Sequence, residues 1–136
     1  MIRISLLLVS LGLFLNANVI DWQDDYEDAH AKAIQENKIF YIFIVSETCH
    51  WCHKMKKTTM LDKEVINRLN KDYVAVELIR GFDEYPELLH AKMVPKHYFL
   101  TPDEKEIYAL PGYWNSEDFS SILDDVTKKY KKMKVK

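Results

Sequence analysis

The chain has 136 residues, of which 48% are hydrophobic and 29% charged, and its formal net charge at pH 7 is −2. Nothing in this charge suggests the strongly basic character on which nucleic-acid binding depends, so no nucleic-acid partner is expected. The length suits one domain and is too short for two.

The first 17 residues have the pattern of a secretory signal peptide. Arg3 supplies a positive start, residues 4–15 form an apolar stretch, and Leu15-Asn16-Ala17 resembles a cleavage site. The prediction is therefore an exported, periplasmic protein whose mature domain spans residues 18–136. Because Leu15 stands where a small residue is preferred, an uncleaved N-terminal anchor is the alternative.

The mature chain begins with a predicted helix over residues 21–37, where Trp22, Tyr26, Ala29 and Ala33 fall on one face. Residues 38–45 follow as an almost continuous apolar run, rich in β-branched and aromatic side chains. Such a run is typical of a strand that is buried on both faces of a sheet.

Three further elements are predicted in the middle of the chain. A helix begins at the cysteine pair and continues to about Met60, and Asp62 is predicted to cap a helix over residues 63–70. Residues 73–79 form a second β-rich run. Pro86 suggests the start of a short helix or turn that continues to residue 91.

The last part of the chain predicts a hairpin and a closing helix. Residues 97–100 and 106–110 are the two strands, and Ser116 is the expected N-cap of the final helix. Strands that alternate with helices predict an α/β fold, with a central mixed sheet of four to five strands flanked by helices.

Cys49-His50-Trp51-Cys52-His53 is the motif that carries chemistry. As C-x-x-C it is a dithiol, and as C-x-x-C-H it is also the pattern of c-type haem attachment. Because the motif stands between a buried strand and the start of a helix, Cys49 is expected to be stabilised as a thiolate, the nucleophilic form. We favour the dithiol on this ground.

Three alternatives to a redox dithiol remain. Haem would need His53 and a second axial ligand such as Met60, Met93 or His97, and zinc would need a histidine beside the two cysteines. A purely structural disulfide is the third, but closing so small a loop contributes little stability. We therefore expect no metal and no cofactor, and a redox partner that is another molecule.

The dithiol, the strand before it, Val94-Pro95 before a later strand, and the terminal helix together resemble the thioredoxin superfamily. Residues 48–55 more narrowly resemble the thioredoxin-like domain of spermatogenesis-associated-20-type proteins. The arrangement is also similar to the C-terminal domain of the bacterial transmembrane electron carrier. The resemblance implies that Cys49 attacks, Cys52 resolves, and Pro95 is a cis-proline facing the dithiol, with Val94 presenting its backbone to substrate.

The chain also departs from this pattern. Phe43 stands where thioredoxins carry a buried aspartate, so either another acid, Glu47 or Glu77, assists the resolving thiol or the second half-reaction relies on water. Protonated His50 would favour the thiolate and make the disulfide more oxidising. Trp51, between the cysteines, is expected to contact substrate.

These observations predict an exported thiol–disulfide oxidoreductase acting on protein disulfides, with reduction as the favoured direction. Its expected partners are disulfide- or thiol-containing proteins and a redox partner, and the protein is expected to be a monomer. The alternative is a non-catalytic binding module with a local disulfide. The Lys-rich tail, residues 128–136, is expected to be a solvated helix end, with a contact to an anionic membrane surface as the alternative.

Overall fold

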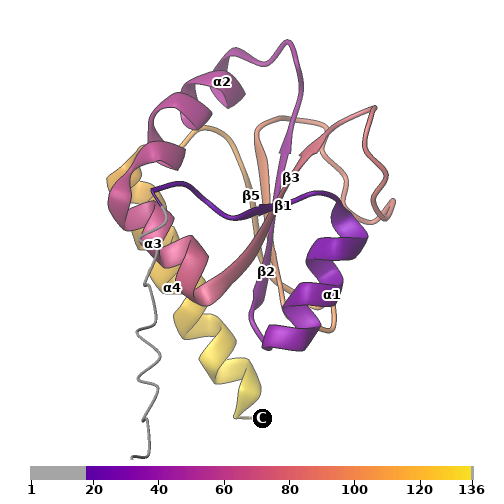
Figure 1. Cartoon of the computed structure of the whole chain (residues 1–136), viewed down its shortest axis with the longest axis vertical. Helices are drawn as coiled ribbons and strands as arrows, with labels where there is room; N and C mark the ends of the chain where they lie inside the picture. Colours follow the sequence, from indigo (N-terminus) through magenta and orange to yellow (C-terminus); the bar gives the residue numbers. More distant parts are fainter. Residues whose placement is uncertain (1–17, 136) are drawn as a thin grey trace, which may run out of the picture.

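The computed structural model describes residues 18–135, which form a five-stranded mixed sheet with helices on both faces (Figure 1). The predicted signal peptide and its cleavage site lie outside the described residues. In chain order the elements are β1 (Trp22–Gln23), α1 (Tyr26–Glu36), β2 (Ile39–Val45), α2 (His50–Lys57), a 3₁₀ turn (Thr59–Leu61), α3 (Lys63–Asp72), β3 (Tyr73–Ile79), β4 (Lys96–Leu100), β5 (Glu106–Pro111) and α4 (Ser116–Lys134).

The strand order is β1-β3-β2-β4-β5, with β1, β3 and β2 parallel and β4 and β5 antiparallel. The central strand β2 is buried at all seven positions, as its continuous apolar run predicts. In its pairing with β4, Phe43 lies opposite His97 and Ile44 lies opposite Lys96. This pairing brings the dithiol, which follows β2, to the same end of the sheet as Val94-Pro95, which precede β4.

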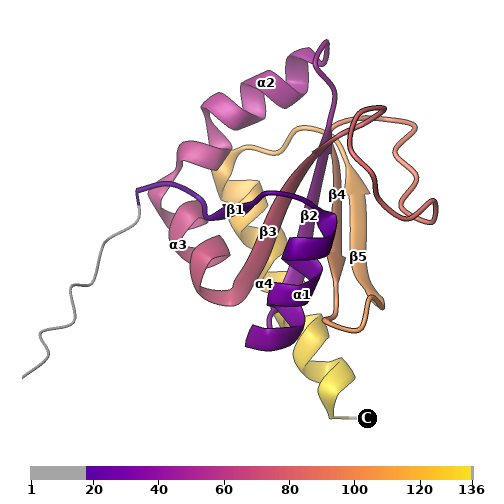
Figure 2. The same ribbon diagram turned by 45° about the vertical axis from the view of Figure 1, so that its right-hand side comes forward.

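Each face of the sheet has its own hydrophobic core. Tyr41 and Phe43 of β2 pack on the side of α2, α3 and α4, whereas Phe40 and Ile42 pack on the side of α1 (Figure 2). The alternation follows from the pleat, which turns successive side chains to opposite faces. Both faces are thereby covered, as expected.

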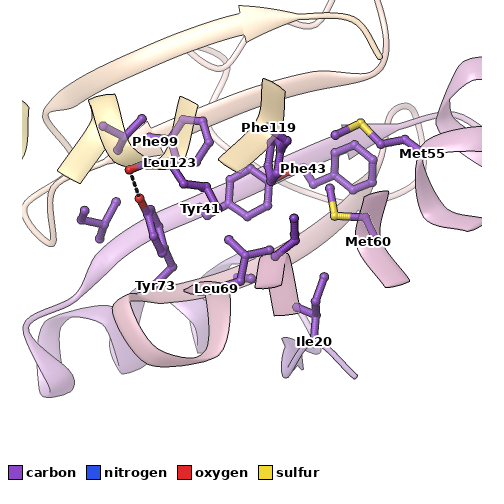
Figure 3. Packing of buried hydrophobic residues seen from close by; sticks show 14 of the residues in the cluster. Ile20, Tyr41, Phe43, Met55, Met60, Leu69, Tyr73, Phe99, Phe119 and Leu123 are labelled. Carbon is purple, nitrogen blue, oxygen red and sulfur yellow. Dashed lines mark hydrogen bonds between the residues drawn. The ribbon is translucent and has the colours of Figure 1, made fainter. Parts of the chain in front are cut away.

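The larger core is dominated by aromatic rings (Figure 3). The ring centroids of Tyr41 and Phe99 lie 4.8 Å apart, and Phe119 of α4 packs 5.9 Å from Tyr41. The Tyr73 hydroxyl donates a 2.8 Å hydrogen bond to the carbonyl oxygen of Leu123. This bond ties β3 to α4 and satisfies a buried polar group that would otherwise be destabilising.

The start of the chain differs from the prediction of a helix over residues 21–37. Trp22–Gln23 forms the short strand β1, paired in parallel with β3, and α1 begins only at Tyr26. Asp25 is the N-cap, and its carboxylate accepts the N–H of Asp28 at 2.8 Å. The helix ends at Asn37, whose φ of 52° is a left-handed conformation that asparagine tolerates well.

Of the short helix or turn predicted over residues 86–91, the structure has the turn, because residues 80–95 form an irregular loop between β3 and β4. Pro86 begins only one turn, in which its carbonyl oxygen accepts the N–H of Leu89 at 2.9 Å. The base of the loop is fixed by the Asp83 carboxylate, which accepts the N–H of Ile79 at 2.6 Å.

The remaining helix boundaries are close to those predicted. Asp62 caps α3 as expected, by accepting the N–H groups of Glu64 and Val65 at 3.0 and 3.1 Å. The N-cap of α4 is Asn115 rather than Ser116, and its side chain accepts the N–H of Asp118 at 2.9 Å. The helix that follows the dithiol stops at Lys57, before the 3₁₀ turn.

Across residues 18–135, no helix combines the length and the apolar character needed to cross a membrane. The Lys-rich tail belongs to α4, whose last turn carries Lys131, Lys132 and Lys134. Cations at this position complement the negative end of the helix dipole.

Candidate active site

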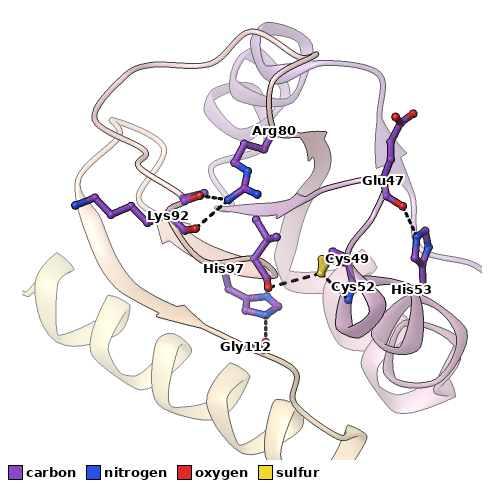
Figure 4. Close-up of a disulfide and its surroundings, with 10 residues drawn as sticks. Glu47, Cys49, Cys52, His53, Arg80, Lys92, His97 and Gly112 are labelled. Atoms are coloured by element: carbon purple, nitrogen blue, oxygen red, sulfur yellow. Dashed lines mark hydrogen bonds between the residues drawn. A yellow bond between two sulfur atoms is a disulfide. The ribbon is translucent and has the colours of Figure 1, made fainter.

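The dithiol lies where the central strand β2 ends and α2 begins (Figure 4). Cys49 is the N-cap of α2 and forms a disulfide with Cys52. The backbone N–H of Cys52 donates to the Cys49 sulfur at 3.1 Å. In the reduced protein, this N–H and the positive end of the helix dipole would favour a thiolate on Cys49.

The two cysteines differ in accessibility. Cys52 is 1% exposed and belongs to the larger core, together with Met55 one turn further along α2, whereas Cys49 is only partly buried. A partner sulfur can therefore reach Cys49 but not Cys52. This asymmetry suits an attacking role for Cys49 and a resolving role for Cys52.

The Val94-Pro95 segment faces the dithiol, and the peptide bond between the two residues is cis. The Val94 carbonyl oxygen lies 3.6 Å from the Cys49 sulfur, across a separation of 45 residues in sequence. The Pro95 carbonyl oxygen accepts the N–H of Gly112 at 2.8 Å. The structure thus brings together Cys49, Val94 and Pro95. The hydrogen bond from Gly112 attaches the Val94-Pro95 segment to the residues that follow β5.

Arg80 contacts the residues that precede Val94, a role that was not predicted from the sequence. Its guanidinium donates to the carbonyl oxygens of Ala91 and Lys92 at 2.7 and 3.0 Å. Its backbone N–H donates to the carbonyl oxygen of Val45, the last residue of β2, at 2.8 Å. Arg80 therefore links the strand before the dithiol to the segment before Val94 (Figure 4).

His97, two residues after Pro95, is fully buried and makes hydrogen bonds through both ring nitrogens. Its Nε2 lies 2.9 Å from the Gly112 carbonyl oxygen and its Nδ1 lies 2.9 Å from the Tyr41 hydroxyl. A carbonyl oxygen can only accept, so Nε2 carries the hydrogen and Nδ1 accepts from Tyr41. Burial lowers the pKa of His97 to about 4, which keeps the ring neutral at neutral pH.

Phe43 occupies the position of the buried acid and is itself fully buried, with its ring centroid 5.2 Å from that of His97. Its neighbour in β3 is Glu77, whose carboxylate lies 2.5 Å from Lys56 Nζ. Lys56 follows Cys52 by four residues, so the two lie on one face of α2. Of the two acids considered from sequence, Glu77 is thus the one whose carboxylate contacts α2, the helix that carries Cys52.

Glu47 and His50, predicted to tune the dithiol, are placed differently from each other. The Glu47 carboxylate points away from the two sulfur atoms (Figure 4), and its carbonyl oxygen accepts a 2.7 Å hydrogen bond from His53 Nε2. His50 is exposed, and its ring meets that of Trp51 edge-on at 5.4 Å. Glu47 therefore contributes through its backbone, while the His50 ring stays on the exposed surface of α2 next to the dithiol.

Trp51, the predicted substrate contact, is 50% exposed. Its ring lies 5.5 Å from that of Tyr113, the residue after Gly112. The N–H of Gly112 is hydrogen-bonded to the Pro95 carbonyl oxygen. Tyr113 and Trp51 therefore lie next to the Val94-Pro95 segment.

The zinc alternative needs several ligands at one point. Across residues 18–135, no three His, Cys, Asp or Glu side chains are grouped closely enough to hold a metal ion. His53, the residue that haem attachment would use, contacts the Glu47 carbonyl oxygen through Nε2.

Comparison of the sequence with known proteins gives two matches of interest. Residues 13–136 match the family Thioredox_DsbH, described as "Protein of unknown function, DUF255". Human spermatogenesis-associated protein 20 is 30% identical over 97 residues, which are 63% of this chain and 12% of that protein. The chain thus spans about an eighth of the length of this curated relative, and the resemblance predicted from residues 48–55 is confirmed.

Comparison of the structure identifies thioredoxin-fold proteins. A thioredoxin from Thermus thermophilus has a TM-score of 0.69 at 22% identity, covering 81% of this chain and 88% of that one. A protein described as DsbH oxidoreductase has a TM-score of 0.61 at 16% identity, covering 80% of this chain and 85% of that one. The predicted thioredoxin-like fold is therefore confirmed.

Proposed function

The chain belongs to the Thioredox_DsbH family, and we propose that it is an exported thiol–disulfide oxidoreductase that acts on protein disulfides. One observation carries the proposal. Cys49 is accessible at the start of α2, faces the Val94 carbonyl oxygen at 3.6 Å, and is bonded to a buried Cys52. An accessible sulfur that a neighbouring shielded sulfur can attack, so that the bound substrate sulfur leaves, is the arrangement that disulfide exchange requires.

In the reducing direction, the reaction begins with the Cys49 thiolate attacking one sulfur of the substrate disulfide. The substrate S–S bond breaks, a mixed disulfide between Cys49 and the substrate forms, and the second substrate sulfur leaves as a thiolate that takes a proton from solvent. The Cys52 N–H stabilises the attacking thiolate beforehand.

The second step releases the substrate. The Cys52 thiol loses its proton and attacks the Cys49 sulfur, so the mixed disulfide breaks and the Cys49–Cys52 disulfide forms. The substrate gains two electrons and leaves as a dithiol, and the protein is oxidised by the same two electrons. An external dithiol protein is then required to reduce Cys49 and Cys52 again.

We propose Glu77 as the group that helps Cys52 lose its proton, because Phe43 cannot. Glu77 is paired with Lys56 on the same face of α2 as Cys52. A carboxylate in this position can accept a proton directly or through water, which is the role of a general base.

The direction of electron flow follows from the reduction potential. Reduction is our proposed direction, whereas stabilisation of the Cys49 thiolate by the α2 N-terminus and His50 acts towards oxidation. A measured potential near −270 mV would support a reductase, and one near −120 mV would support an oxidase.

We propose that the protein is a monomer that acts in the periplasm. Its proposed interaction partners are thiol- or disulfide-containing proteins and one external redox partner. Attraction of the Lys131, Lys132 and Lys134 end of α4 to an anionic membrane is a separate proposal. Vesicles with and without anionic lipid would test it by co-sedimentation.

Insulin reduction with an added reductant tests the function. We expect wild type to accelerate the reaction, and Cys49→Ser to remain at the uncatalysed rate because no attacking sulfur remains. Equal rates for the two proteins would show that the dithiol is only a local clasp, as in a non-catalytic binding module.

A further inference from the structure

Beside the dithiol, Lys54 stands between two aromatic rings. Its Nζ lies 5.0 Å from the centroid of Trp51 and 4.8 Å from that of Tyr113. The two rings are 5.5 Å apart. Because the ammonium group is attracted to both ring faces, the cation is held at one place rather than sampling the range of a free lysine.

The charge of Lys54 is not neutralised within the described chain. Among residues 18–135, Lys54 has no carboxylate at salt-bridge distance, whereas Lys56 on the same helix is paired with Glu77. Lys54 is also exposed. An ammonium group has three donors, so contact with the rings leaves N–H groups available to a carboxylate.

The cluster of Trp51, Lys54 and Tyr113 lies at the edge of the path that a substrate must take. Trp51 is between the two cysteines, and Tyr113 follows Gly112, which is bonded to the Pro95 carbonyl oxygen. The Val94 carbonyl oxygen lies 3.6 Å from the Cys49 sulfur. A polypeptide that presents a sulfur to Cys49 therefore passes close to both Val94 and this cluster.

The surroundings of Lys54 are positive. Helix α2 carries three lysines and two histidines and has no acidic residue. The loop over residues 80–95, which leads into Val94, carries charges of both signs: Asp83, Glu84 and Glu87 are acidic, whereas Arg80 and Lys92 are basic. The α2 side of the site is therefore the more positive one.

From this geometry we propose that Trp51, Lys54 and Tyr113 recognise a carboxylate of the substrate, so that the preferred substrates carry an acidic residue on one side of the reacting cysteine. The inference rests on the proposed thiol–disulfide exchange and adds the substrate class to it. A carboxylate on the other side of the cysteine would lie further from Lys54, so the attraction is expected to favour one side only.

Short peptides with one cysteine, each joined by a disulfide to mercaptoethanol, provide the test. One peptide carries Glu two residues before the cysteine, a second carries Glu two residues after it, and matched peptides carry Lys or Gln at these places. The fully reduced protein is mixed with each peptide at low salt, and peptide thiol released in a single turnover is measured after acid quenching. Rates with dithiothreitol, a neutral reductant, correct for the intrinsic reactivity of each peptide.

We expect one of the two Glu peptides to react about fivefold faster than its Lys counterpart, and the preference to fall at high salt. Lys54→Gln should reduce the preference below about twofold, while Lys54→Arg should retain it, because a guanidinium also stacks on aromatic rings. Lys57→Gln is the matched control, since it removes the same charge from the same helix without touching either ring.

Two results would overturn the inference while leaving the proposed function intact. One is equal reduction of all the peptides, and the other is an equal loss of preference in Lys54→Gln and Lys57→Gln, which would indicate only a general attraction. If wild type reduces none of the peptides faster than Cys49→Ser does, the proposed function fails as well.

Discussion

Acidification should destabilise this protein through His97. The ring is fully buried and neutral, with a pKa of about 4 in the folded chain and an ordinary value of 6.5 when solvated. Between these two values the unfolded chain binds a proton that the folded chain does not. The contribution of His97 to the free energy of unfolding is therefore fully present above the pKa of the unfolded chain. This contribution is lost as the pH falls towards the pKa of the folded chain.

The magnitude follows from the two pKa values. Each unit of difference corresponds to about 1.4 kcal/mol, and lowering the pH from about 7 to about 4.5 should reduce the free energy of unfolding by about 2 kcal/mol. The carboxylates whose pKa is lowered, Asp21 and Asp103, start from an ordinary value of 3.8 and so lose their contribution only at more acid pH.

Urea denaturation of the oxidised protein across this pH range would measure the loss. In His97→Gln the free energy of unfolding should be lower at neutral pH, because the ring packing with Phe43 is lost, but it should vary little between the two pH values. If this variant does not fold, NMR titration of wild type is the second measurement, and the His97 ring should remain neutral down to about pH 5. A wild-type stability independent of pH, or a His97 that titrates with its ordinary pKa, would refute the reasoning.

Four further predictions concern the site and one cap. In the reduced protein, iodoacetamide at neutral pH should modify Cys49 before Cys52, and mass spectrometry of the labelled peptides gives the order. Cys52→Ser should accumulate mixed disulfides with partner proteins, whereas Cys49→Ser should not. Modification of Cys52 first would exchange the two roles. Pro95→Thr should lengthen the lifetime of such complexes on non-reducing gels, and an unchanged lifetime would separate this residue from the exchange. Glu77→Gln should slow release of the mixed disulfide by about tenfold or more while leaving the first attack unchanged, as followed by quenched flow; equal slowing of both steps would exclude a role as base. Asp62→Ala should lower the free energy of unfolding by about 1 kcal/mol in urea, because two N–H groups at the start of α3 lose their acceptor, and a change below about 0.3 kcal/mol would show that water replaces the cap.

The sequence predicted the elements whose pattern is long enough to be unambiguous. The apolar runs that became β2 and β3 were placed to within one residue, because β2 is buried at all seven positions and β3 is interrupted by only one polar residue, Glu77. β1 was missed because Trp22 continues the helical spacing of Tyr26, and a two-residue strand has no period of its own. The pairing of β1 with β3 depends on a strand fifty residues away, which no local pattern contains.

The same limit applies to the site. The dithiol and Val94-Pro95 could be found because motif and resemblance mark them directly. Arg80 and Tyr113 act through contacts made by the sheet topology, and nothing in their neighbouring residues indicates these contacts. His97 had a weak signal, since it is a histidine at a buried position of its strand, and a buried residue of this kind needs partners for its ring nitrogens.

The strand order also determines when Cys49 becomes selective during synthesis. The strands β1, β2 and β3 and the helix that carries the dithiol are all complete once residue 79 has emerged, whereas β4 follows only after the 80–95 loop. A nascent or truncated chain that stops short of β4 would therefore carry a reactive thiol without Val94 or Tyr113 beside it. The thiol and two members of the proposed recognition cluster, Trp51 and Lys54, are thus encoded in the first part of this chain, whereas Val94 and Tyr113 come from the last.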